Sequence, residues 1–225
     1  MRTTPPMLPL RPPLLAALAG SALLLLLQAM PTVAPFLEYR RSALSAEPWR
    51  LLTGHLVHVN WMHALANAGA WVLLSYLFAP RLSVARQLLA LALGAAAVSL
   101  ALAAGYPAIA WYRGASGALH ALFFAGATVA LARSARRRPR SMALLPLALV
   151  VAGWIKVAVD LPRGGVTAYA DWLGVSTVPQ AHLIGAIAGT ALGVYFAARS
   201  RLRPSVSLAR DGGKSPVPPP AAAAR

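Results

Sequence analysis

Residues 178–198 read VPQAHLIGAIAGTALGVYFAA, an apolar run that opens with a proline and a histidine. About 20 such residues cross the hydrocarbon core of a bilayer as a helix, so the run predicts a membrane span. Gly185, Gly189 and Gly193 recur every four residues and therefore share one face of that helix. His182 precedes Gly185 by three residues and lies over the same face. The pattern predicts a helix that packs closely against a neighbour and presents a histidine near its start.

A matching stripe of small residues occurs earlier, in the stretch GASGALHALFFAGATVAL at residues 114–131. Gly117, Ala121 and Ala125 again repeat every four residues, and Ser116 stands just before them. If the two stripes pack together, Ser116 meets His182, as a nucleophile and its general base require. Two plainer interpretations remain open: Ser116 as an ordinary helix N-cap, and the stripes as general membrane packing.

The composition indicates that lipid is the solvent for most of the chain. Hydrophobic residues make up 58% of the 225 residues and charged residues only 12%. We therefore predict an all-α membrane protein, a bundle of six transmembrane helices over residues 14–200. A short segment, 1–13, precedes the bundle, and a tail rich in Pro, Ala and Ser, 201–225, follows it and is expected to be disordered. The six predicted spans are Leu14–Met30, Trp61–Phe78, Leu88–Ala104, Gly117–Leu131, Met142–Val159 and Val178–Ala198.

The positive charges predict the orientation of the bundle. Lys and Arg number 21 against five acidic residues, and most of them lie in the termini and in alternate loops. The opposite loops hold Arg40, Arg41, Arg50, Arg113 and Arg163. Because cytoplasmic loops are enriched in Lys and Arg, both termini are expected on the cytoplasmic side. This distribution accounts for the basic charge without a nucleic-acid partner. The chain has no cysteine, hence no thiol nucleophile and no thiolate metal site.

Polar residues collect at the starts of the second, fourth and sixth predicted spans. These three spans run in the same direction, so their first residues share one depth near the outer face. His63 and Asn67 are four residues apart, on one face of the second span. With the backbone N–H of Ser116, they could stabilise the oxyanion of a tetrahedral intermediate. An interhelical hydrogen-bonding pair is the alternative.

No acidic residue lies in the same layer as His182, so the sequence predicts a Ser–His dyad without a third member. Lys156 and Asp160 are four residues apart in the fifth span and are expected to neutralise each other at its end.

Together these segments resemble the rhomboid family of intramembrane serine proteases. The matching motifs are His58-x4-His63-x3-Asn67, Gly114-Ala-Ser116-Gly117, and Ala181-His182-x2-Gly185-x3-Gly189, in the family's order. The resemblance implies Ser116 as nucleophile, His182 as base, and His63, Asn67 and Gly114 around the oxyanion or substrate. His58 would support the loop, and Gly117, Gly185 and Gly189 would allow close helix packing.

One residue points to a branch of that family. His120 stands one turn after Ser116, where many rhomboids have a tyrosine. Gly-x-Ser-Gly-x-x-His, with Trp49-Arg50-Leu-Leu-Thr53, is similar to the rhombosortase branch. That resemblance implies substrates with a C-terminal Gly-Gly sorting helix, a bacterial inner-membrane location and a site opening toward the periplasm. His120 would orient His182 or fill space.

The expected activity is hydrolysis of a peptide bond in or near a substrate's transmembrane helix, within the lipid bilayer and with no metal or organic cofactor. A non-catalytic rhomboid-like protein that binds transmembrane helices is the main alternative. A proton-coupled transporter would be expected to show internal repeats, and none is evident. A zinc protease would need His-Glu-x-x-His, and no glutamate lies among His55, His58 and His63.

Overall fold

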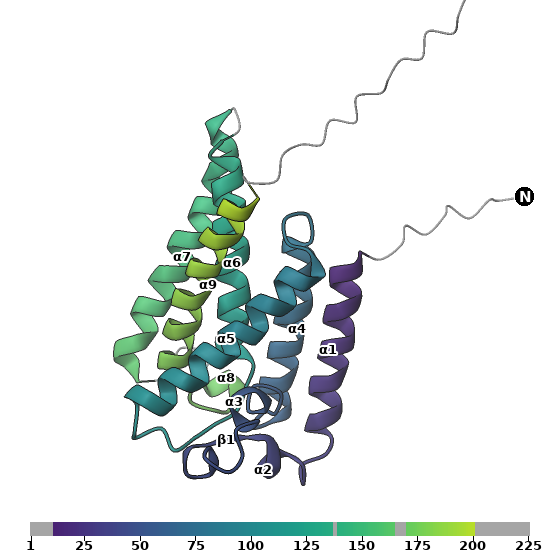
Figure 1. The fold of residues 1–225 in the computed structure, drawn as a ribbon, viewed down its shortest axis with the longest axis vertical. Helices are drawn as coiled ribbons and strands as arrows, with labels where there is room; N and C mark the ends of the chain where they lie inside the picture. The colour runs from purple at the N-terminus through teal and green to yellow at the C-terminus, as the bar shows by residue number, and fades with distance from the viewer. Residues whose placement is uncertain (1–10, 137–138, 165–169, 201–225) are drawn as a thin grey trace, which may run out of the picture.

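The computed structural model describes residues 11–136, 139–164 and 170–200 of the chain. The predicted tail, 201–225, and most of the predicted N-terminal segment, 1–13, lie outside these residues. Six long helices follow the six predicted spans in order (Figure 1). They are α1 Pro12–Gln28, α4 Trp61–Phe78, α5 Val84–Gly105, α6 Ser116–Ser134, α7 Leu144–Asp160 and α9 Pro179–Arg199.

Four of the long helices, within the described residues, are long and apolar enough to cross a membrane: α5, α6, α9 and the α7 region, Arg140–Arg163. The shorter apolar helix α1 has 17 residues, and its first two positions are prolines, whose fixed φ suits a helix start. The protein is thus a helical integral membrane protein, while the count of six spans stays a prediction.

Successive long helices alternate in direction, so α1 begins and α9 ends at the same end of the bundle (Figure 1). This arrangement is the one that an even number of crossings produces. The assignment of that end to the cytoplasm stays a prediction.

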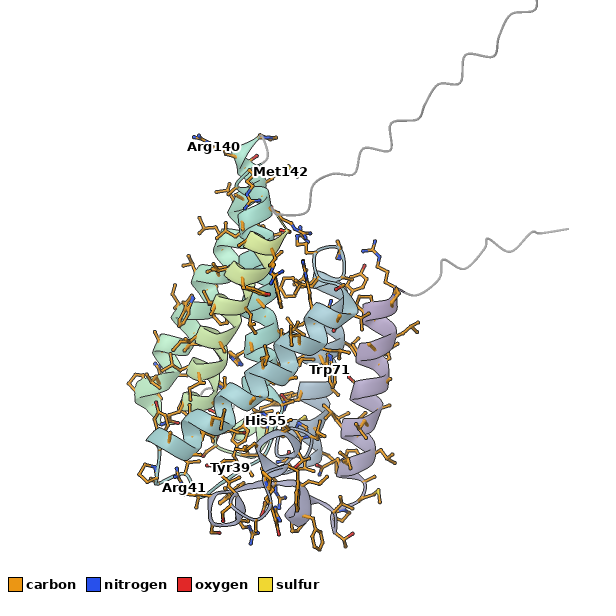
Figure 2. The ribbon with its side chains drawn as sticks, in the orientation of Figure 1. Tyr39, Arg41, His55, Trp71, Arg140 and Met142 are labelled. Carbon is orange, nitrogen blue, oxygen red and sulfur yellow. The ribbon has the colours of Figure 1, made fainter. Side chains whose placement is uncertain are left out.

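The short elements gather at the opposite end, where α4, α6 and α9 begin (Figure 1). They include a two-stranded antiparallel sheet, in which Tyr39 pairs with Tyr112 and Arg40 with Trp111. The all-α prediction did not include this pair, in which two loops far apart in sequence satisfy each other's backbone groups, but the described structure is mostly helical. The short elements at this end are α2 Ala34–Leu37, β1 Tyr39–Arg40, η1 Arg41–Ala43, α3 Arg50–Thr53, β2 Trp111–Tyr112, η3 Leu161–Arg163 and α8 Ala170–Leu173. One further short helix, η2 Arg140–Ala143, lies at the other end of the bundle, where Figure 2 labels Arg140.

Charged side chains fasten these loops to the helix ends. Glu38 accepts hydrogen bonds from Arg40 at 2.5 Å and from Arg113 at 2.7 Å, which joins the segments beside β1 and β2. The guanidinium of Arg41 donates to the carbonyl oxygens of Leu102 at 2.5 Å and Ala103 at 2.6 Å, at the last turn of α5. Figure 2 shows Tyr39, Arg41 and His55 together at this end. The loop that leads into α6 is therefore held on several sides.

Helix α6 is the centre of the bundle and contacts α4, α5, α7 and α9. Leu122, Ala125 and Val129 on it have no exposed surface. On the other side, α1 packs on α4 through Gly20, where an added Cβ would lie 2.2 Å from the indole of Trp71. Trp71 lies midway along the bundle in Figure 2. The central helix therefore carries Ser116 on the most enclosed element of the described structure.

Candidate active site

Ser116 is the first residue of α6, and the turn before it is held by backbone contacts. The N-cap of the helix is Ala115, with no side-chain capping hydrogen bond, so Ser116 is not the helix N-cap. Gly114 has a φ of +123°, a backbone conformation that residues with a side chain rarely adopt. Its N–H donates a hydrogen bond to the Gly54 carbonyl oxygen at 3.0 Å. The hydroxyl of Ser116 is thus not used to cap its own helix.

His182 lies in the first turn of α9, three residues after Pro179, and is only 3% exposed. Its Nε2 lies 3.0 Å from Ser116 Oγ, across 66 residues of sequence. This distance is within hydrogen-bond reach of a nucleophile and its base. The two residues that the sequence placed on separate stripes therefore meet.

The two small-residue stripes face each other, as predicted. A Cβ added at Gly185 would lie 2.1 Å from the Gly117 carbonyl oxygen, and one at Gly189 would lie 2.3 Å from that of Ala121. At Gly193 the nearest atoms belong to Thr128 and Ala125. No side chain fits between the backbones, so glycine sets the separation of α6 and α9. We call this contact the α6–α9 seam.

His120 lies one turn beyond Ser116 and stacks on His182. The two rings are 4.2 Å apart between centroids and inclined by 13°. His120 Nδ1 also lies 2.7 Å from the Ser116 carbonyl oxygen. Of the two roles left open, the contacts favour an orienting one, because His120 touches both members of the pair.

The predicted oxyanion residues lie around the same turn but differ in their present contacts. The ring of His63 packs against Gly114, where an added Cβ would be 2.6 Å from its Cε1. Asn67 is 5% exposed, and its Nδ2 donates to the His63 carbonyl at 2.9 Å. This bond uses one of the two N–H groups of the amide, and donation to an oxyanion would use the other.

His58 lies outside the helix, in the loop before α4. Burial first, and then the neighbouring His63 and His55, lower the pKa of His58 to about 3. The neutral ring accepts a long hydrogen bond of 3.5 Å, at Nε2, from the backbone N–H of Ala115. Its position is that of a support for the turn that carries Ser116.

A largely apolar cavity of about 330 Å³ opens beside Ser116 between α4, α6 and α7. A larger surface hollow of about 660 Å³ lies over Glu38 and Arg113 but contains neither Ser116 nor His182. We assign the candidate site to the smaller cavity, because Ser116 lines it. Its walls are formed by Asn67, Ala70, Leu73, Leu74, Ser116, Leu119, His120, Phe123, Gly153 and Lys156.

Sequence reasoning placed Lys156 in an ion pair with Asp160, and the two side chains do pair at 3.1 Å. It missed that Lys156 Nζ also lies 3.3 Å from Nδ1 of His182. The available signal was a lysine inside an apolar span, which by itself marks a functional candidate. Its distance from His182 depends on how α7 packs, which spacing alone does not give.

The fold and this geometry define a helical membrane protein with a serine–histidine pair at one end of its bundle, in which the histidine is buried and the serine half-buried. The model of the Rhomboid domain matches residues 45–199, more than half of the chain. The chain belongs to the rhomboid family, whose members are generally intramembrane serine proteases acting on membrane proteins within the bilayer. No curated protein matches the chain at a significant level.

Proposed function

We propose that this protein is an intramembrane serine endopeptidase with a Ser116–His182 dyad. The observation that carries the proposal is the 3.0 Å separation of Ser116 Oγ from His182 Nε2, at the edge of an apolar cavity. A catalytically inactive helix-binding protein has no need of a nucleophile and a base in contact. This distance therefore supports an enzyme over the non-catalytic alternative.

In the proposed reaction Ser116 Oγ attacks the peptide carbonyl while its proton moves to His182 Nε2. The tetrahedral intermediate collapses when His182 returns that proton to the leaving amine, which leaves an acyl-enzyme on Ser116. Water, deprotonated by the same imidazole, then releases the second product. No metal or organic cofactor takes part in any of these steps.

The oxyanion of the intermediate would be stabilised by donors at the start of α6. The first N–H groups of a helix have no partner within the helix, so the backbone N–H of Ser116 is placed for this role. Asn67 from α4 supplies a side-chain amide in the same cavity. His63 would support this region from outside the cavity, since its ring packs against Gly114 in the turn before Ser116.

The substrate would be the transmembrane helix of a membrane-anchored protein, and the Gly-Gly sorting helix of a surface protein is the type we propose. A helical backbone hides its carbonyl groups from attack, and two adjacent glycines loosen it. The proposed setting is the bacterial inner membrane, with six spans, cytoplasmic termini and a site that opens toward the periplasm. The resemblance of the Gly-x-Ser-Gly-x-x-His segment to the rhombosortase branch supports this choice.

A fluorophosphonate probe tests the proposal directly, because an activated serine attacks its phosphorus atom and displaces fluoride, which leaves a phosphonylated serine. Wild-type protein in detergent should be labelled, and both Ser116→Ala and His182→Ala should lose labelling by at least about 1,000-fold. Thermal unfolding of each variant checks that it is folded. Folded wild type that takes up no probe would favour the helix-binding alternative.

A further inference from the structure

Lys156 touches the side of His182 that faces away from the nucleophile. Its Nζ lies 3.3 Å from His182 Nδ1 and 3.1 Å from His120 Nε2. The same atom pairs with Asp160 Oδ2 at 3.1 Å. The lysine of α7 thus links a carboxylate on its own helix to both histidines of the site, on α6 and α9.

The protonation of His120 follows from its other contact. Its Nδ1 lies 2.7 Å from the carbonyl oxygen of Ser116, which can only accept, so Nδ1 carries the proton. In the neutral ring Nε2 is then an acceptor. Lys156 therefore donates one N–H to His120, whichever charge the lysine carries.

The charge of Lys156 decides which nitrogen of His182 carries the proton. An ammonium has no lone pair and can only donate, so His182 Nδ1 would accept and Nε2 would hold the hydrogen. In that tautomer Nε2 cannot take the proton of Ser116. A neutral amine instead donates to His120 and Asp160 and accepts the Nδ1–H of His182, which leaves the Nε2 lone pair facing Ser116.

We infer that Lys156 is a positioning residue that works as a neutral amine, holding His182 in its basic tautomer, and that protonation of Lys156 switches the dyad off. This inference deepens the proposed function and rests on it. During attack the Ser116 O–H bond breaks, its proton joins His182 Nε2 and the new Oγ–C bond forms. The Nδ1–H bond to Lys156 persists throughout, and the proton later leaves from Nε2 with the amine, so no other reactant is required.

Among the residues that the structure describes, the charged and titratable groups named here around Lys156 come from four helices. Asp160 on α7 favours the ammonium, whereas the apolar walls of the cavity favour the neutral amine. His120 on α6 and His182 on α9 contact Nζ, and His63 on α4 is within electrostatic range of His182. The Lys156 side chain is 36% exposed, so protons can reach it from the cavity.

Two substitutions of Lys156 separate this role from a structural one. Lys156→Arg keeps a cation that cannot lose its proton, so it should donate permanently to His182 Nδ1 and reduce the rate of fluorophosphonate labelling more than about 100-fold. Lys156→Met can neither donate nor accept and leaves the tautomer unbiased, so a loss of about 10-fold is expected. If Lys156 served only to pair with Asp160, the arginine variant would be the more active of the two.

Asp160→Asn gives a second readout that keeps Lys156 in place. Removing the carboxylate makes the ammonium less stable, so the acid side of the labelling profile should move by about one pH unit to lower pH. A purely structural ion pair would leave the profile where it is and change only thermal stability.

Labelling of Lys156→Arg at the wild-type rate, or an unmoved profile for Asp160→Asn, overturns this inference and leaves the proposed function intact. Absence of labelling in folded wild type overturns the proposed function and this inference with it. Labelling rates that fall in the order wild type, Lys156→Met, Lys156→Arg, together with the shifted pH profile of Asp160→Asn, support both the proposed function and this inference.

Discussion

The two sides of helix α6 differ in how tightly they are packed. Toward α9, backbone meets backbone along the α6–α9 seam, with no room for a Cβ at Gly185 or Gly189. Toward α4 and α7, the cavity of about 330 Å³ separates the helices beside Ser116. The share of the most apolar stretch that is buried inside the molecule is 61% for α6 and 11% for the α7 region.

This difference in packing suits the two sides of α6 to different roles. The seam fixes the distance between Ser116 on one helix and His182 on the other, which for the proposed nucleophile and base has to be correct within a fraction of an ångström. The cavity side has apolar walls and room for part of another helix. A bilayer enzyme of this proposed kind needs both, because the substrate has to reach a site that cannot itself move.

Among substitutions that test this comparison and leave Ser116, His182 and Lys156 unchanged, the largest effect is expected from a single methyl group in the seam. Gly185→Ala places a Cβ against the Gly117 carbonyl oxygen, so α9 has to move and His182 moves with it. We expect about 100-fold slower fluorophosphonate labelling and a free energy of unfolding lower by about 1–3 kcal/mol. Probe kinetics and thermal unfolding in detergent measure the two losses.

A glycine outside the seam, in the hollow between α1 and α4, supplies the control. Gly69 in α4 has no atom within 4 Å of an added Cβ. Gly69→Ala should leave labelling unchanged and stabilise the helix by roughly 0.5–1 kcal/mol. Equal effects of the two substitutions would show that the seam is no more constrained than the rest of the bundle.

The second effect concerns a polar residue on the cavity side. Asn67→Ala removes a proposed oxyanion donor and should lower kcat by about 100-fold with little change in KM, because the bond forms only in the transition state. Cleavage assays with a transmembrane peptide give both constants. An unchanged kcat would assign Asn67 to its hydrogen bond with the His63 carbonyl alone.

A smaller effect is expected when the cavity itself is narrowed. Ala70 lines the cavity from α4, and Ala70→Leu adds three carbon atoms to its wall. The kcat/KM for cleavage of a helical substrate should fall by about 10-fold, while the rate of labelling by the small fluorophosphonate probe falls by less than about threefold. Equal losses in both assays would mean that the substitution had disturbed Ser116 rather than access.

The smallest effect is a pH dependence of stability at the loop end of the bundle. Burial raises the pKa of the Glu38 carboxyl, but hydrogen bonds from Arg40 and Arg113 outweigh it and hold the pKa below the ordinary value of 4.5. The ionised carboxylate therefore stabilises the fold above about pH 4.5, and this contribution is lost as pH falls through the depressed pKa.

Between pH 6 and pH 3 the melting temperature of wild type should consequently fall further than that of Glu38→Gln, by no more than about 3 °C. Parallel thermal scans of both proteins measure the difference. Identical profiles would remove the Glu38–Arg113 pair from the list of contacts that hold the loop before α6.

The comparison also separates what was readable in the sequence from what was not. The six long helices and the two matching stripes followed from apolar length and four-residue spacing, which are properties of single helices. The meeting of Ser116 and His182 was expected only if those stripes packed against each other, which they do in the structure. The β1–β2 pair was not predicted, since two residues per strand leave no alternation to detect.

The sequence by itself determined that this chain lies in a membrane and that two of its helices carry matching stripes of small residues, with Ser116 and His182 near their starts. The tertiary structure decided that the stripes pack together and bring Ser116 against His182. Only the tertiary structure decided where α7 places Lys156, how His120 stacks on His182, and where the cavity opens. The residues on one face of a helix recur at a fixed interval along the chain, so the sequence alone shows which residues share a face. The distance from Lys156 to His182 depends on the rotation of one helix against two others, which no single periodicity encodes.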